Sequence, residues 1–351
     1  MVFNPEHIAR ENILSLTAYS SARQEFAEDA EIYLDANENA FGSPVETQLN
    51  RYPDPLQSKV KEKIAALKGV DQDQIFLGNG SDEAIDLLFR IFCEPRRDEV
   101  IICPPTYGMY KVSADINDIA IKEIPLTQNF QLDVPRILES ITERTKLIFI
   151  CSPNNPTGNA LNRGEILRIT ADFHGIVIVD EAYIDFSSVR SIIDEIENFS
   201  NLVVLHTFSK AWGLAGARVG MAFAGEEIIE LFNRVKPPYN ISQLSQNTAL
   251  AALDNEAKVK NWVEEIVEQR RRLADAVSEL EFVLTVFPSD ANFLLVKVTD
   301  AAAVYKFLLE KKIVVRDRSN IRLCGCCLRI TVGTPEENSR LLAVLKTFGK
   351  N

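Results

Sequence analysis

The segment from residue 146 to residue 210 holds three short apolar runs, each ending in polar residues: KLIFICSPNNPTG (146–158), GIVIVDEAY (175–183) and NLVVLHTFSK (201–210). Runs of this length, rich in Ile, Val and Leu and stopped at turn-forming residues, are typical of strands buried on both faces of a sheet. Between the first two lies RGEILRITADF, which has the apolar spacing of a helix. This alternation of strands and helices predicts βαβ units and a mostly parallel sheet.

The same alternation continues on both sides of this segment, in QIFLGNG, DEAIDLLFRIFCE, EVIICPP, IAIKEIPL and ARVGMAFAG. A long helical stretch then covers residues 241–280, and its length predicts a helix that bridges two domains. The later runs FVLTVFPSDANFLLVKV, AAAVYKFLLEKKIVVRD and LCGCCLRITVG predict strand, helix and strands. We therefore expect an α/β protein with a large domain at 36–250 and a smaller α+β domain, which residues 251–351 form together with an N-terminal arm, 1–35.

The composition limits the class of protein. The chain has 351 residues, 46% of them hydrophobic and 25% charged, which suits a soluble globular protein of about two domains. A net charge of −12 without any basic run argues against a nucleic-acid partner. No apolar run approaches the roughly 18 residues that span a bilayer, and the N-terminus lacks the layout of a signal peptide. We expect a cytoplasmic protein without a membrane segment.

Three of the six cysteines, Cys324, Cys326 and Cys327, crowd together in LCGCCLRI. A zinc site would need a second cluster of ligands, and the three histidines of the chain are scattered. We interpret these cysteines as small apolar residues of a strand and predict no metal site.

Polar residues that follow the apolar runs are the candidates for a site, because ligands of open α/β sheets bind beyond the carboxyl ends of the strands. Taken singly, each has an ordinary alternative. Asn154–Gly158 is a typical turn, Asp180 and Ser81 are typical caps, and Lys210 is typical of a solvated surface. The acids Asp82 and Glu83 even weaken the case for an anion at the start of the helix that follows QIFL.

Taken together, these residues match the chemical groups of pyridoxal phosphate (PLP). A phosphate is bound by backbone N–H groups at a helix start, a hydroxyl and an arginine. A protonated ring nitrogen needs a carboxylate, the ring oxygen needs neutral donors, and the aldehyde needs an amine. For the phosphate, Ser81 and Asp82 supply the N–H groups, Thr207 or Ser209 the hydroxyl, and Arg218 the guanidinium. Asp180 supplies the carboxylate for the ring nitrogen, and Asn155 and Tyr183 supply the donors for the ring oxygen. Lys210 supplies the amine for the aldehyde.

Eight motifs then follow one another along the chain: LDANEN, RYPDP, GNGSDEAIDLL, PPTYGMY, SPNNPTG, VDEAY, SKAWGLAGARVG and LRITVG. By this set the chain resembles, over nearly its whole length, the fold type I PLP-dependent aminotransferases of the aspartate aminotransferase superfamily. Within them it is most similar to the enzymes that transaminate histidinol phosphate in histidine biosynthesis. The resemblance implies PLP as cofactor, with histidinol phosphate and glutamate or 2-oxoglutarate as substrates.

The resemblance also implies roles for single residues. Lys210 binds the cofactor and is the catalytic base, assisted by Asp180 and Tyr183, and Tyr107 stacks on the cofactor ring. Thr207 and Ser209 both bind the phosphate. Tyr52 reaches the phosphate of the cofactor in the partner subunit, which implies a homodimer.

The substrate, in turn, is held by Arg329 at its anionic end, by Tyr19 at its phosphate, and by Asn37 and Asn155 along the site. The resemblance does not decide which further arginine assists Arg329; the candidates are Arg316, Arg318 and Arg322.

Other functions remain open on the sequence. An aromatic amino acid aminotransferase and a threonine-phosphate decarboxylase share the fold, although Tyr19 and Arg329 suit a phosphate-bearing substrate. A regulator built on this fold, which is not an enzyme, would add a DNA-binding segment and a basic patch. A dinucleotide-binding oxidoreductase is disfavoured because GNGSDE lacks the third glycine of the G-x-G-x-x-G pattern.

Overall fold

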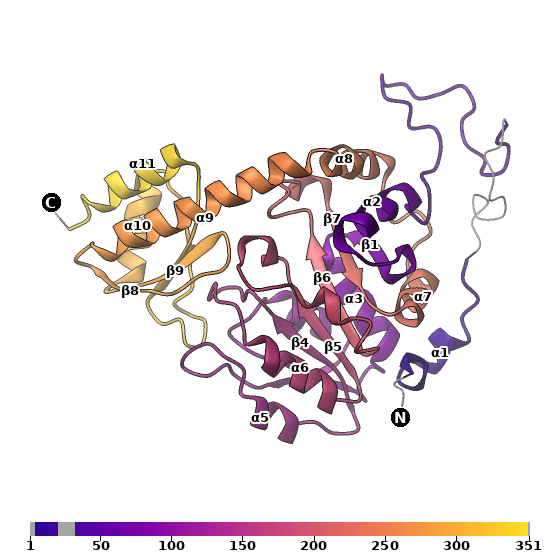
Figure 1. Cartoon of the computed structure of the whole chain (residues 1–351), viewed down its shortest axis with the longest axis horizontal. Helices are drawn as coiled ribbons and strands as arrows, with labels where there is room; N and C mark the ends of the chain where they lie inside the picture. The colour runs from indigo at the N-terminus through magenta and orange to yellow at the C-terminus, as the bar shows by residue number, and fades with distance from the viewer. Residues whose placement is uncertain (1–3, 20–31, 350–351) are drawn as a thin grey trace.

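The computed structural model describes residues 4–19 and 32–349, and within them the chain is built around two β-sheets (Figure 1). The larger sheet has seven strands in the order β1-β7-β6-β5-β4-β2-β3. Only β7 runs against the others, so the mostly parallel sheet predicted from the sequence is confirmed. The strands are β1 (Ile75–Asn79), β2 (Glu99–Ile102), β3 (Ala120–Glu123), β4 (Thr145–Cys151), β5 (Ile176–Asp180), β6 (Leu202–Thr207) and β7 (Val219–Phe223).

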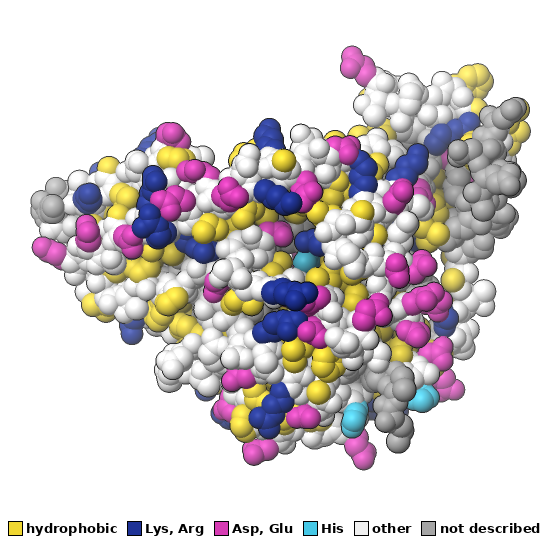
Figure 2. All heavy atoms as spheres, in the orientation of Figure 1, with side chains coloured by type: hydrophobic (Ala, Val, Ile, Leu, Met, Phe, Trp, Pro, Cys, Tyr) yellow, Lys and Arg dark blue, Asp and Glu magenta, His cyan; other side chains and the backbone are white. Residues whose placement is uncertain are grey.

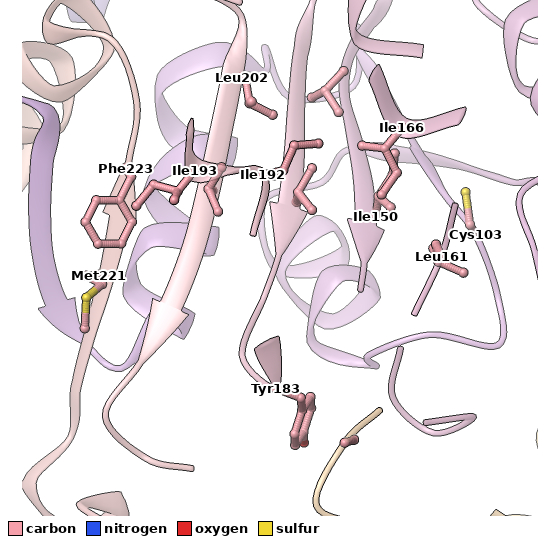
Figure 3. Close-up of a cluster of buried hydrophobic side chains, with 14 of the residues drawn as sticks. Cys103, Ile150, Leu161, Ile166, Tyr183, Ile192, Ile193, Leu202, Met221 and Phe223 are labelled. Carbon is pink, nitrogen blue, oxygen red and sulfur yellow. The ribbon is translucent and has the colours of Figure 1, made fainter. Parts of the chain in front are cut away.

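Helices cover both faces of this sheet, which explains why its central strands are continuous apolar runs. In β5, Val177 and Val179 face one hydrophobic cluster, while Ile176 and Ile178 face the other. Figure 3 shows part of the first cluster, in which side chains of neighbouring strands meet and Tyr183 lies beyond a strand end. The surrounding helices are α2 (Ser58–Lys68), α3 (Ser81–Phe92), α4 (Met109–Ile116), α5 (Val134–Glu139), α6 (Arg163–Asp172), α7 (Glu226–Val235) and α8 (Gln243–Leu253).

The smaller sheet has four strands in the order β10-β11-β9-β8 and its own hydrophobic cluster. Its strands are β8 (Val283–Val286), β9 (Phe293–Val298), β10 (Arg316–Asp317) and β11 (Cys327–Thr331), and its helices are α10 (Ala301–Glu310) and α11 (Pro335–Leu345). The 23-residue helix α9 (Glu256–Ser278) runs from α8 to this unit (Figure 1). On α9, Arg270 Nη1 donates to the carbonyls of Phe186 and Ala291, and so joins the two units at 3.2 and 2.7 Å.

The cysteine cluster differs from its expected place in a strand. Only Cys327 lies in β11, while Cys324 is buried in the preceding turn and Cys326 is exposed with φ 56°. The turn is closed by a hydrogen bond from the Cys327 N–H to the Cys324 carbonyl, which explains why the strand begins late. No group of three or more His, Cys, Asp and Glu side chains that could hold a metal occurs in residues 4–19 and 32–349.

The N-terminal segment packs on the larger unit. The short helix α1 (Glu11–Leu14) buries Ile13 in a cluster with residues of α3 and α7, and Arg10 pairs with Glu94 at 3.0 Å. Residues 20–31 of the predicted N-terminal arm lie outside the described residues. From residue 32 the chain continues through a segment that stands away from the body (Figure 1), where the side chains of Leu34 and Phe41 are 86% and 102% exposed.

Lys and Arg side chains are interspersed with Asp and Glu on the face drawn in Figure 2. Across the described part of the chain, no helix is both long and apolar enough to cross a membrane.

The turn between β1 and α3 presses directly on Gly220 of β7. A Cβ added at Gly220 would lie 2.1 Å from the Ser81 backbone nitrogen and 2.3 Å from the Gly80 carbonyl carbon. Because both atoms belong to the backbone, we expect Gly220→Ala to lower the free energy of unfolding by about 3 kcal/mol. Chemical denaturation measures this loss. Gly216→Ala is the control, since no atom of the described residues beyond its own chain neighbours lies within 4 Å of its added Cβ. An equal loss in both variants would contradict the prediction.

Candidate active site

A cavity of about 610 Å³ opens at the carboxyl ends of the parallel strands. Its size falls in the range of small-molecule sites. The predicted site residues that line it are Ser81, Asp82, Tyr107, Asn155, Asp180, Tyr183, Thr207, Ser209, Lys210, Arg218 and Arg329. Residues from β1, β4, β5 and β6 meet here because their carboxyl ends lie along one edge of the sheet.

One end of the cavity has the donors of an anion site. Helix α3 begins there without a side-chain cap on its first N–H groups. Gly80 has φ 76°, and a Cβ at this position would lie 2.5 Å from Nη2 of Arg218. Arg218 itself is held by its Nη1, 3.5 Å from the Ser209 Oγ. Because Gly80 and Arg218 approach closely, the first N–H groups of α3, the Ser209 hydroxyl and the Arg218 guanidinium lie near one another at this end of the cavity.

The two acids of GNGSDE, which argued against an anion on the sequence, both have partners. Glu83 Oε2 accepts from the Asn79 N–H and side chain, and both of its oxygens accept from Asn240 Nδ2. Asp82 accepts from the Tyr107 hydroxyl at 3.0 Å and pairs with Arg218 at 3.3 Å. Glu83 therefore fixes the turn, and Asp82 holds two residues of the cavity wall.

Asp180 ends β5 with its side chain buried, being 3% exposed. Its Oδ2 accepts from the Tyr110 hydroxyl at 2.7 Å and its Oδ1 accepts from the Ala182 N–H at 3.1 Å. Burial raises the pKa of Asp180, while these two hydrogen bonds lower it in part. A buried carboxylate with only neutral donors is suited to a cationic partner in the cavity.

The side chain of Glu181, the residue after Asp180, contacts other residues than Asp180 does. It accepts from Ser191 Oγ and from the Ile192 N–H at 2.8 Å, and it pairs with the buried His206 Nε2 at 2.9 Å. These contacts tie the end of β5 to β6 and to the following loop. The backbone that carries Asp180 is thereby fixed on both sides.

Lys210 follows β6, and its Nζ lies 5.5 Å from the centre of the Tyr183 ring. Burial and, next in size, the cation of Arg329 lower the pKa of Lys210. A lower pKa leaves a larger share of the ε-amine uncharged near neutral pH, and the uncharged amine is the nucleophile and the base.

Arg329 on β11 enters the cavity from the smaller unit. Its Nη1 donates to Asn155 Oδ1, and its guanidinium lies 5.3 Å from the centre of the Phe293 ring. Arg318 lines the same cavity, and its Nε is buried without a hydrogen-bond partner in residues 4–19 and 32–349. Burial and the neighbouring Arg318 cation lower the pKa of Arg329. Among the described residues neither arginine pairs with a carboxylate, so the two cations are suited to bind an anion.

The three arginines that the sequence left open as partners of Arg329 differ in whether they line the cavity. Arg316 lies opposite Arg329 in the β10–β11 pair, where directly opposed side chains share a face, but it is exposed and outside the cavity. Arg322 is also exposed. Of the arginines left open by the sequence, Arg318 is the one that lines the cavity.

Tyr52, Asn37 and Tyr19 are not brought to this cavity within one chain. Tyr52 stacks on Tyr239 at 4.4 Å and lines a separate hollow together with Asn37. Tyr19 is 73% exposed and lines a third hollow, as does Lys236.

Sequence reasoning did not single out Tyr110, although it lies in the motif PPTYGMY. Tyr110 is buried and contacts the ring of Tyr107 edge-on at 5.6 Å. Tyr107 lies in the loop before α4 and Tyr110 in its first turn, so no helical spacing relates the two residues.

Comparisons with known proteins agree with this geometry. A family model described as "Aminotransferase class I and II" matches residues 31–345. The chain is 54% identical to the histidinol-phosphate aminotransferase of Parabacteroides distasonis, over 97% of this chain and 98% of that protein. It is 51% identical to the histidinol-phosphate aminotransferase of Cytophaga hutchinsonii, over 99% of this chain and 100% of that protein. The structure of histidinol-phosphate aminotransferase from Sinorhizobium meliloti in complex with pyridoxal-5'-phosphate matches with TM-score 0.80 at 22% identity, covering 89% of each chain, which shows the fold.

Proposed function

Because the chain belongs to the class I and II aminotransferases, we propose that it transfers the amino group of L-histidinol phosphate to 2-oxoglutarate, giving imidazole acetol phosphate and glutamate in histidine biosynthesis. The observation that carries this proposal is one cavity that holds Lys210 together with two anion sites. One anion site suits the phosphate of PLP, and the other suits the phosphate of the substrate. Relatives of about 50% identity that bear this enzyme name support the choice of substrate.

The residues of the cavity fit PLP group by group. The N–H groups of Ser81 and Asp82, the hydroxyls of Thr207 and Ser209, and Arg218 surround the place for its phosphate. The absence of a Cβ at Gly80 keeps that place open, since a Cβ there would meet Arg218 at 2.5 Å.

The ring of the cofactor has partners in the rest of the cavity. Asp180 would bind the protonated ring nitrogen, Asn155 and Tyr183 would donate to the ring oxygen, and Tyr107, which lines the same cavity, would pack against the ring. Lys210 would hold the aldehyde carbon. When bound, the cofactor supplies an aldehyde that takes up the substrate's amino group and a protonated ring that draws electrons from the substrate Cα.

Lys210 and the arginines then act on the substrate. The Nζ of Lys210 removes the proton from the substrate Cα as the general base. Arg329 and Arg318 bind the substrate phosphate, which places Cα before Lys210. The same arginines bind a carboxylate of 2-oxoglutarate in the second half of the reaction, so kinetics of the ping-pong type are expected.

A panel of substrates tests the proposal. With 2-oxoglutarate as acceptor, histidinol phosphate should be used far better than phenylalanine or tyrosine, and threonine phosphate should release no carbon dioxide. Equal use of histidinol phosphate and phenylalanine would favour an aromatic aminotransferase. Release of carbon dioxide from threonine phosphate would favour the decarboxylase.

Substitution of Arg329 or Arg318 should lower the activity with histidinol phosphate, whereas substitution of the exposed Arg322 should not. We expect Arg329→Gln to lower kcat/KM for histidinol phosphate by about 100-fold and Arg318→Gln by about 10-fold, because each removes charged hydrogen bonds to the phosphate. Arg322→Gln is the matched control, since Arg322 is exposed. Steady-state kinetics with histidinol phosphate measure the change. Loss of activity only in the control would show that the phosphate binds elsewhere.

The exposed segment after residue 32 supports a homodimer. The side chains of Ile32, Leu34, Phe41 and Tyr52 are 75%, 86%, 102% and 51% exposed, more apolar surface than a monomer usually leaves uncovered along one segment. A second copy that covers it also brings the partner subunit's Tyr52 toward the cofactor phosphate.

The cysteines support a cytoplasmic location. All six are free thiols, which fits a reducing compartment.

A further inference from the structure

The hydroxyl of Tyr110 is the one side-chain donor to Asp180 among the described residues. Tyr110 is 0% exposed, and its hydroxyl lies 2.7 Å from Asp180 Oδ2. Within the part of the chain that the structure describes, the other oxygen, Oδ1, accepts only from the Ala182 N–H at 3.1 Å. A single neutral side chain therefore accompanies the carboxylate that faces the cofactor ring.

The ring of Tyr110 is fixed in place. It stacks on Phe149 with the ring centres 4.9 Å apart and the planes 20° apart, and it meets the Tyr107 ring at 86°. Tyr110 lies in the first turn of α4, directly after the loop that carries Tyr107. Its hydroxyl is held at Asp180 by this packing, so the hydrogen bond costs little conformational entropy.

The protonation of Asp180 depends on this hydroxyl for a physical reason. Burial favours the uncharged acid and raises the pKa of Asp180, whereas the donated hydrogen bond from Tyr110 favours the charged carboxylate. With the cofactor bound, Asp180 and its ring nitrogen would compete for one proton. A hydrogen bond donated to Asp180 would favour the proton on the nitrogen.

We propose that Tyr110 is a positioning residue that keeps Asp180 ionised and thereby keeps the ring nitrogen of the bound cofactor protonated, an inference that rests on the function proposed above. Tyr110 does not touch the reacting atoms; it acts through Asp180. The same residue contacts the ring of Tyr107 edge-on, so the two residues assigned to the cofactor ring, Asp180 and Tyr107, share one neighbour.

The test reads the proton on the ring nitrogen directly. The holoenzyme is prepared with PLP labelled with ¹⁵N in the ring, and the ¹⁵N chemical shift, which separates protonated from unprotonated pyridine nitrogen, is followed against pH. Tyr110→Phe keeps the ring and its packing and removes only the hydroxyl. We expect it to shift the equilibrium about tenfold toward the unprotonated nitrogen. The control Tyr305→Phe, on α10, should match the wild-type protein.

A second substitution keeps the test decisive if Tyr110→Phe does not fold. 3-Fluorotyrosine placed at position 110 keeps the ring and donates a stronger hydrogen bond, so the equilibrium should move the other way, toward the protonated nitrogen. Chemical shifts that stay at their wild-type values in either folded protein would overturn the proposal, even if activity falls. If the wild-type protein does not bind PLP, the proposed function fails instead, and the two failures are therefore distinct.

Discussion

Replacing Lys210 by alanine should lower the rate of transamination by about 10⁴-fold and remove the absorbance band of the lysine-bound cofactor. The variant loses the amine that holds the cofactor and the base that moves the Cα proton, and a positioned base alone contributes up to about 10⁴-fold. The pKa of Lys210 is lowered by burial and by Arg329, so this amine is prepared for both tasks. Absorbance spectra and steady-state kinetics with histidinol phosphate measure the two losses.

The control is an exposed lysine that lies away from the cavity. Lys258 on α9 is exposed and lies over the ring of Trp262 at 4.9 Å, so Lys258→Ala should keep the absorbance band and the rate. Retention of both in Lys210→Ala would rule out the assigned cofactor site.

The inactive variant also tests the proposed dimer. Subunits with Lys210→Ala, mixed and refolded with subunits carrying Tyr52→Ala, form some heterodimers. In these, one site combines an intact Lys210 with an intact Tyr52 from the other chain, and activity should rise above that of either variant alone. If Tyr52 acts within its own chain, mixing should restore nothing.

Much of the sheet could be predicted because strands buried on both faces carry their signal locally. KLIFIC and GIVIVD became β4 and β5, since a continuous apolar run that stops at polar residues has few other places in a fold. The reversed direction of β7 did not follow from its own composition. Residues 208–218 between β6 and β7 are too few for the usual helical crossover, so the connection and not the strand dictates the antiparallel pairing.

In the candidate site, too, some residues could be predicted from the sequence and others could not. Lys210 and Asp180 could be placed because a strand end locates them on the ligand-binding edge of the sheet. The contact of Tyr110 with Asp180 joins residues 70 positions apart, and no local pattern predicts it. The choice of Arg318 depends on the path of the loop before β11, which only the packing of the smaller unit determines. Tyr52 lies outside the cavity of its own chain, so its proposed role needs a second copy.

Asp180→Asn should leave the fold and the binding of the cofactor phosphate intact, yet slow transamination by about 10³-fold. The amide has nearly the shape of the carboxylate, and its one oxygen can still accept from one of the two groups that donate to Asp180, the Tyr110 hydroxyl or the Ala182 N–H. It carries no charge, however, and cannot hold a proton on the ring nitrogen, so stabilisation of the charge that develops at the substrate Cα is lost.

The loss should appear in kcat rather than in cofactor affinity, because the phosphate end of the cavity, with Ser209 and Arg218, is untouched. Single-turnover kinetics and a titration with PLP separate the two. A cofactor analogue methylated at the ring nitrogen carries a permanent positive charge and does not need a proton there. It should therefore raise the rate of Asp180→Asn relative to the same variant with PLP. A variant as fast as the wild-type protein with PLP alone would show that Asp180 does not serve the ring nitrogen, and the role of Tyr110 would then have no target.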